Sequence, residues 1–184
     1  METYEAIMTR RSVPRCEGEV DRAIVDKLLA AAVRAPNHHL TQPWRFVVIR
    51  GEARSDLAGA WAAGLTRLGK DASRVQDKVL RAPVIICVVE RPHLENPKVV
   101  EVEEHHAVGA AIQNILLAAH ALGLGAMHRT GEAVRLPEVR AHLGAAADEL
   151  IAGFVYVGRP PEGADRRPAS RRTDHREITE WRGW

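Results

Sequence analysis

Residues 34–44 read Arg-Ala-Pro-Asn-His-His-Leu-Thr-Gln-Pro-Trp and separate an alanine-rich helical segment from an apolar segment of strand-like composition. The two prolines restrict the backbone, and most of the residues between them are polar. A short, stiff loop between two packed elements holds its side chains at fixed angles, as the binding site of a flat ligand with several hydrogen-bonding groups requires. The residues alone leave a second interpretation open, an ordinary helix-to-strand connection with two solvated histidines.

The segments on either side of this loop have clear periodicities. Apolar residues recur at helical spacing from residue 20 onward, and Pro36 stops this helix because it forces the preceding residue out of helical geometry. After the loop, residues 44–49 are rich in strand-forming residues and are followed by Gly51. The sequence therefore predicts a helix, the loop and a strand in direct succession.

Two longer apolar segments indicate the core. Residues 84–89 are a continuous apolar run of strand length, which predicts a central strand buried on both faces. Residues 103–122 form the most apolar predicted helix, which should run through the core or an interface. Further helices are predicted over residues 2–11, 57–68, 73–80 and 137–144, and further strands over residues 126–130 and 151–157.

The chain is predicted to be one domain, residues 1–158, followed by an arm, residues 159–184. No internal repeat or linker interrupts the first part. The arm is rich in proline and charge yet contains Ile178, Trp181 and Trp184. Because such a composition cannot fold alone, we expect the arm to dock on a second copy of the chain.

Composition excludes several classes of protein. The net charge of +2 is too small and too dispersed for a nucleic-acid-binding surface. No apolar run has membrane-spanning length, and no secretory leader pattern is visible, so we expect a cytoplasmic protein with reduced thiols. Cys16 and Cys87 have no metal-binding or CxxC spacing, and Cys87 is expected to be a small core residue.

Two polar clusters combine arginine with a hydroxyl group. Arg10-Arg11-Ser12 follows the first predicted helix, and Arg129-Thr130 ends a predicted strand. Arginine binds phosphate through fixed, bidentate, permanently charged contacts, and a neighbouring hydroxyl adds a donor or acceptor. Adjacent arginines at a helix end are also common as solvated residues that the helix dipole favours, so a surface role stays open.

The loop between the two prolines is the third polar cluster. Gln42 precedes Pro43 and is therefore expected to be extended, and its amide offers both a donor and an acceptor to the polar edge of a pyrimidine-like ring. His38 could stack on such a ring or hydrogen-bond to it, and His39 is expected to be exposed.

Other kinds of site find little support in the sequence. Neither HExxH nor paired-cysteine spacing is present, so no metal site is expected. Residues 103–106, Glu-Glu-His-His, are interpreted as the charged first turn of the long helix, although contact with a substrate stays open. The GxSxG motif is absent, and Gly123-Leu-Gly125 follows a helix and lacks the third glycine of a dinucleotide fingerprint.

In this order, these clusters resemble the FMN-dependent nitroreductase family, in particular its small NAD(P)H nitroreductases. The resemblance runs from Arg10-Arg11-Ser12 through residues 34–44 and the helix that closes at residues 122–125 to Arg129-Thr130 and the strand over residues 153–158. It spans nearly the whole chain. The sequence departs from the family pattern at His128, where relatives often have tryptophan.

The resemblance implies an α+β fold, a three-layer sandwich with a mostly antiparallel sheet flanked by helices, in a homodimer that exchanges its C-terminal arms. FMN would lie at the dimer interface. The phosphate and ribityl chain would be held near Arg10 and Arg129, and the ring system near His38 and Gln42. The cofactor-binding residues implied are Arg10, Arg11, Ser12, Arg34, Pro36, Asn37, His38, Gln42, His128, Arg129 and Thr130, with Arg34 from the facing subunit or the same loop.

The implied activity is hydride transfer from NADH or NADPH through FMN to a nitroaromatic, quinone or similar small-molecule acceptor, with ping-pong kinetics. No catalytic side chain is expected, because the flavin carries the chemistry. The alternatives are a non-catalytic flavin-binding protein and a specialised flavin enzyme, either a dehalogenase or a flavin-cleaving enzyme. A dehalogenase would require a lid that closes over the substrate. The connection between the predicted strands that end at residue 49 and begin at residue 84 is predicted to be mostly helical, so it offers no obvious lid.

Overall fold

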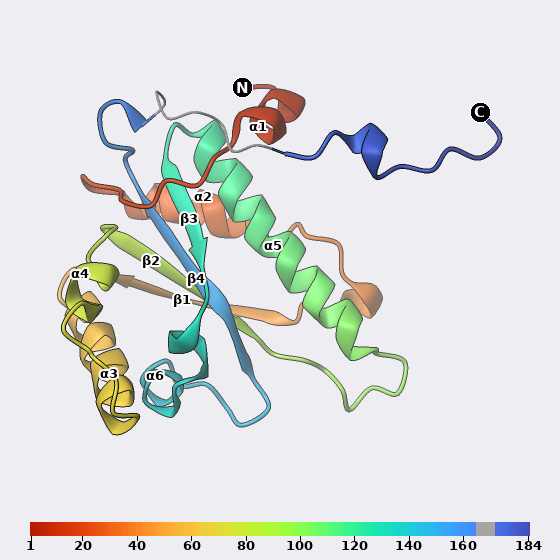
Figure 1. The fold of residues 1–184 in the computed structure, drawn as a ribbon. Helices are drawn as coiled ribbons and strands as arrows, with labels where there is room; N and C mark the ends of the chain where they lie inside the picture. Colours follow the sequence, from red (N-terminus) through yellow and green to blue (C-terminus); the bar gives the residue numbers. More distant parts are fainter. Residues whose placement is uncertain (165–171) are drawn as a thin grey trace.

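The computed structural model describes residues 1–164 and 172–184 and contains one four-stranded sheet (Figure 1). The strands are β1 (Trp44–Arg50), β2 (Val84–Glu90), β3 (Gly125–Arg129) and β4 (Leu150–Gly158), in the order β1-β2-β4-β3. All three pairings are antiparallel. All seven residues of β2 are buried, which confirms the predicted central strand.

Helices cover both faces of the sheet, so the α+β sandwich expected from the resemblance is confirmed (Figure 1). On one face, α2 (Arg22–Ala32) and α5 (Glu101–Ala121) pack over Val84, Ile86 and Val88. On the other face, α3 (Ala53–Arg67), α4 (Val75–Val79) and α6 (Pro137–His142) pack over Ile85 and Cys87. Successive residues of β2 thus pack into two separate hydrophobic cores, one on each face of the sheet, because side chains alternate along a strand.

The observed boundaries differ from the predicted ones at the chain start and at the long helix. Helix α1 spans Thr3–Thr9, and its residues Tyr4, Ile7 and Met8 are exposed, whereas Ala6 is buried. Helix α5 begins at Glu101, two residues earlier than predicted. Short 3-10 helices lie at η1 (His38–Leu40), η2 (Glu132–Arg135) and η4 (His175–Glu177).

The segment after α1 covers the outer edge of the sheet. Ser12 bridges Ala126 of β3 in parallel, and Val13 donates a hydrogen bond from its backbone N–H to the carbonyl oxygen of Ala126 at 3.0 Å. Further on, Glu17 pairs with Arg159 just after β4. The Arg-rich segment is therefore held along β3, the strand that carries the second arginine cluster.

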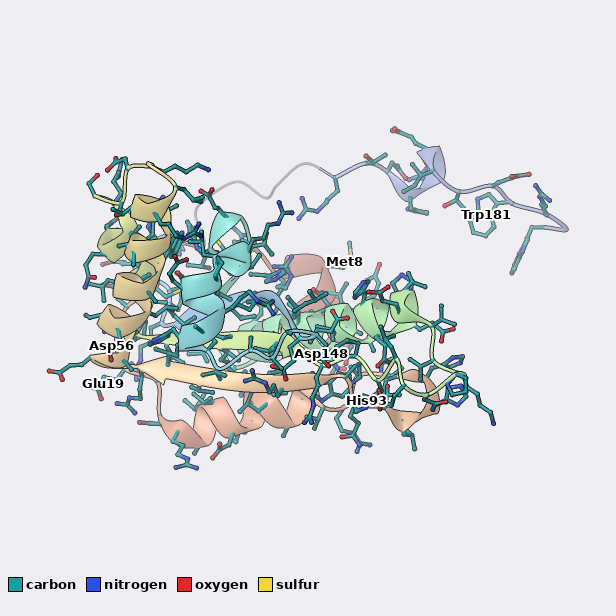
Figure 2. All side chains as sticks on the ribbon, turned by 90° about the horizontal axis from the view of Figure 1, so that it is seen from below. Met8, Glu19, Asp56, His93, Asp148 and Trp181 are labelled. Carbon is teal, nitrogen blue, oxygen red and sulfur yellow. The ribbon has the colours of Figure 1, made fainter. Side chains whose placement is uncertain are left out.

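The arm leaves the domain after β4. Of the predicted arm, residues 159–184, the part from 165 to 171 lies outside the described residues. Ile178, Trp181 and Trp184 are exposed by 76%, 61% and 98%, far more than is usual for side chains of this size. Figure 2 shows Met8 on α1 and Trp181 on the arm both pointing into solvent. None of the described helices is long and apolar enough to cross a membrane.

Candidate functional site

Arg129 joins β3 to the segment that follows α1. Its Nη2 donates a hydrogen bond to the carbonyl oxygen of Pro14 at 3.0 Å, and its guanidinium lies 5.2 Å from the centre of the Tyr156 ring. Its Nε is buried and has no hydrogen-bond partner among the described residues. A buried guanidinium N–H without a partner is costly, and it marks a place where an oxygen-rich ligand would be bound favourably.

The electrostatics around Arg129 favour an anion. Burial lowers the pKa of Arg129, the positive charge of Arg81 adds to this effect, and Tyr156 opposes it. The ion pairs of the described residues do not include a carboxylate on Arg129. The guanidinium keeps its charge in any case, because arginine does not lose its proton in proteins.

Arg10 and Arg11 lie at the other end of the same segment, beside the last turn of α5. The Thr9 hydroxyl is 2.8 Å from Nε2 of His120. Burial lowers the pKa of His120, and the positive charges of Arg10 and Arg11 lower it further. Both arginines are half-buried and Ser12 is exposed. The structure thus aligns Arg10, Arg11, Ser12 and Arg129 along one edge of the sheet.

Thr130 lies at the end of β3, where it lines an open cavity of about 530 Å³ together with Gly131, Arg67 and Arg135. His128, in contrast, lies on the opposite face of β3 from Arg129. Its Nε2 is 3.2 Å from the carbonyl oxygen of Ala152. Successive residues on a strand point to opposite faces, so the side chains of His128 and Arg129 leave opposite faces of β3.

The loop around His38 lies at the opposite end of α5, next to its first turn. Nδ1 of His38 is 2.9 Å from a carboxylate oxygen of Glu103, and the Thr41 hydroxyl donates to Oε1 of Glu104 at 2.7 Å. Asn37 accepts the backbone N–H of Gln42 through Oδ1 at 2.8 Å. His38, Gln42, Pro36 and Arg34 are exposed, and Asn37 is half-buried. Their side chains are available to a ligand at this end of the molecule.

The expectation that Gln42 is extended is wrong. Its φ is +49°, and His39 and Leu40 also have positive φ, of 52° and 54°. Proline disfavours the right-handed helical region for the residue before it, which the sequence argument used, but Gln42 meets this restriction in the left-handed region. The Asn37 side chain stabilises this geometry, because its Oδ1 accepts a hydrogen bond from the backbone N–H of Gln42.

Glu104 is the residue of this site that sequence reasoning missed. It lies in the first turn of the helix, as predicted, yet it is only 1% exposed. A signal existed, because Glu104 precedes Val108 and Ala111 by four and seven residues and so belongs to the buried stripe of α5. Figure 2 shows His93, whose backbone N–H also binds Glu104, at the end of the molecule that carries η1.

No thiol in the described chain has the properties of a nucleophile. Cys16 and Cys87 are both buried and unpaired. Burial raises the pKa of Cys16 to about 11 and that of Cys87 to about 12, so both remain protonated at neutral pH. Within the described residues, no group of His, Cys, Asp and Glu side chains is arranged to hold a metal ion.

The described geometry therefore combines a cationic sheet edge with a polar loop at the far end of one helix. The family model described as the nitroreductase family matches residues 7–159, which include both groups. The chain belongs to the nitroreductase family. The resemblance drawn from Arg10-Arg11-Ser12 and residues 34–44 is thereby confirmed.

Relatives and solved structures support the family assignment over the whole chain. The chain is 34% identical over 164 residues to the Escherichia coli (strain K12) protein named "Putative NAD(P)H nitroreductase YdjA", covering 87% of this chain and 89% of that protein. A Bacillus cereus nitroreductase-like family protein has a TM-score of 0.87 at 26% identity, covering 100% and 97% of the two chains. A nitroreductase-type protein from Desulfovibrio desulfuricans, solved in complex with FMN, has a TM-score of 0.77 at 31% identity, covering 99% and 97%.

Proposed function

We propose that this nitroreductase is an FMN-dependent enzyme that uses NADH or NADPH to reduce small acceptors such as nitroaromatic compounds and quinones. The observation that carries this proposal is the half-buried side chain of Arg129, whose buried Nε has no partner among the described residues and whose surroundings favour an anion. The names of the relatives and the FMN-bound neighbour support the same reading.

The residues present fit FMN. A flavin nucleotide carries a phosphate at one end and a ring with amide-like hydrogen-bonding groups at the other. Arg10, Arg11, Ser12 and Arg129 supply a cationic edge for the phosphate and ribityl chain. Gln42 and His38 supply an amide and an imidazole to the ring. His128 is not part of this proposal, because its ring lies on the other face of β3.

A second copy of the chain would bring these two groups together. Within one protomer, Glu103 contacts the loop and His120 contacts the arginine segment, and these residues are 17 positions apart on α5. At 1.5 Å per residue, the two contacts are about 25 Å apart along the helix. If two protomers pair with their α5 helices antiparallel, the loop of each lies next to the arginine segment of the other. We propose that each flavin site is built in this way.

The exposed apolar surface supports such a dimer. Tyr4 and Met8 of α1 and Trp181 and Trp184 of the arm are more than half exposed. Exposed aromatic and sulfur-containing side chains of this size usually mark an interface. We therefore propose that the arm of each protomer packs on its partner.

In this arrangement the residues of the protein would bind FMN, orient its ring and shield it. FMN, when bound, supplies the hydride chemistry, so no side chain of the protein is required to act as a nucleophile. Arg129 and Arg10 would hold the phosphate end, so that the ring keeps one position while different small molecules occupy the same open face. Gln42, whose backbone N–H is held by Asn37, would present its side-chain amide to the ring edge.

Initial-rate kinetics of the FMN-loaded protein test this function. Because the reductant leaves before the acceptor enters the same space, rates measured at several acceptor concentrations should give parallel lines in double-reciprocal plots against NAD(P)H. Intersecting lines would rule out the ping-pong mechanism. Protein that binds FMN but oxidises no NAD(P)H with any acceptor would instead be a non-catalytic flavin-binding protein.

A further inference from the structure

Glu104 is a buried carboxylate that the proposed flavin chemistry does not use. It lies in the first turn of α5 and is 1% exposed. Its Oε1 accepts the Thr41 hydroxyl at 2.7 Å, and its Oε2 accepts the backbone N–H of His93 at 3.1 Å. One side chain thus ties the loop that follows α2 to the segment that follows β2.

The loop that Glu104 contacts has a strained backbone. His39, Leu40 and Gln42 all have φ between 49° and 54°. Residues with a Cβ rarely adopt this left-handed region, and such strain persists only where the surrounding structure enforces it. Inside the loop, Asn37 holds Gln42 through its amide. Two side-chain contacts join this strained backbone to the first turn of α5, from His38 to Glu103 and from Thr41 to Glu104, and only the second, the anchor, ends on a buried carboxylate.

The chemistry of this anchor requires a carboxylate. Both partners of Glu104 are donors, and an ionised carboxylate is a pure acceptor, so each oxygen takes one of them. The amino end of α5 favours a negative charge at this position. In the part of the chain that the structure describes, no lysine or arginine pairs with Glu104, so its burial is compensated by these hydrogen bonds and the helix end.

We propose that Glu104 is a positioning residue, which sets the conformation of the loop over residues 36–43 and thereby the placement of Gln42 and His38 in the ligand site. This inference rests on the proposed function for its consequence, since the loop is taken to face the flavin ring. The anchor itself is a property of the chain without a ligand. The two parts can therefore be tested separately.

The first test is hydrogen–deuterium exchange of the full-length protein without flavin. Glu104→Gln replaces one acceptor by an NH₂ group that cannot accept from Thr41 or His93, and Thr41→Val removes the hydroxyl while keeping the side-chain shape. Both variants should exchange the amides of residues 37–44 on the order of tenfold faster than wild type, whereas Thr41→Ser should restore protection. Glu101→Gln, on the same turn but exposed, is the matched control. Unchanged exchange in Glu104→Gln and Thr41→Val would overturn the anchor.

The second test measures FMN affinity in the same variants. Glu104→Gln and Thr41→Val should each raise the Kd for FMN on the order of tenfold, and the double variant should lose clearly less affinity than the sum of the two single losses, because the substitutions share the contact between Thr41 and Glu104. The absorption bands of the bound flavin should shift in the same variants and return in Thr41→Ser. Fully additive losses would overturn the coupling. If exchange increases but wild-type protein binds no FMN, the anchor stands and the proposed function fails.

Discussion

The guanidinium of Arg129 donates a hydrogen bond to the carbonyl oxygen of Pro14 at 3.0 Å and so fixes the arginine-rich segment against β3. This contact uses only part of the donor capacity of Arg129, since its buried Nε has no partner in the described chain. We propose that the guanidinium of this half-buried side chain also contacts a phosphate.

Arg129→Gln should raise the Kd for FMN on the order of tenfold or more, because a charge-assisted phosphate contact is lost. Affinity for riboflavin, which has no phosphate, should change much less. Fluorescence titration with both ligands measures the two effects, and Arg74→Gln, an exposed arginine at the start of α4, is the control. Equal losses for FMN and riboflavin would show that Arg129 shapes the site without contacting the phosphate.

Subunit mixing should restore flavin sites if each site takes residues from two protomers. Arg10→Ala weakens the phosphate end and Gln42→Ala the ring end, so each homodimer should bind FMN poorly. In a heterodimer of the two variants, one site carries both substitutions and the other carries none. Half of the sites should then bind FMN with wild-type affinity. If both groups belong to the same protomer, no site in the heterodimer is intact and tight binding does not return.

Gly153→Ala should destabilise the protein by about 2–4 kcal/mol. Gly153 has a φ of +150°, and a Cβ at this position would overlap with the ring of His128 and approach the carbonyl oxygen of Arg129 to 2.8 Å. Thermal or denaturant unfolding measures the loss. Gly59→Ala on α3, where a Cβ meets no neighbour, should be neutral or stabilising by up to about 1 kcal/mol. A Gly153→Ala protein as stable as wild type would contradict the close packing of His128 on β4.

Glu149 should contribute to stability at neutral pH and lose its contribution in acid. Arg45 binds both carboxylate oxygens, at 2.8 and 2.7 Å, and these hydrogen bonds lower the pKa of Glu149 from its ordinary value of 4.5. A carboxyl group with a lowered pKa in the folded state stabilises the fold above its unfolded pKa and stops doing so as the pH falls through its folded pKa. The difference in unfolding free energy between wild type and Glu149→Gln should therefore be largest near pH 7 and shrink below pH 4.5. Glu19→Gln, at an exposed position, should show no such dependence.

The sequence predicted the elements that follow from periodicity and local chemistry. The continuous apolar run of β2 and the wide apolar face of α5 both indicated burial, and both elements form the core. Gly51 marks the end of β1 at Arg50, whereas α2 ends at Ala32, four residues before Pro36, so the helix ends earlier than the proline alone predicts. The resemblance to the family also predicted that Arg10-Arg11-Ser12 and Arg129 lie near each other, because the family pattern assigns both clusters to one cofactor.

Features that depend on contacts between distant segments were not predictable. The left-handed backbone of Gln42 depends on Asn37, and the burial of Glu104 depends on donors from two loops, Thr41 and His93. The placement of His128 is different, because strand alternation alone separates it from Arg129 once β3 is assigned.

Anaerobic titration of the FMN-loaded protein with NADH and NADPH tests the central claim most directly. The account predicts a yellow protein whose flavin absorbance is bleached by about one equivalent of reductant per flavin and returns when a quinone or nitroaromatic acceptor is added. A protein that takes up no FMN, or one whose bound flavin stays oxidised with both reductants, would contradict it.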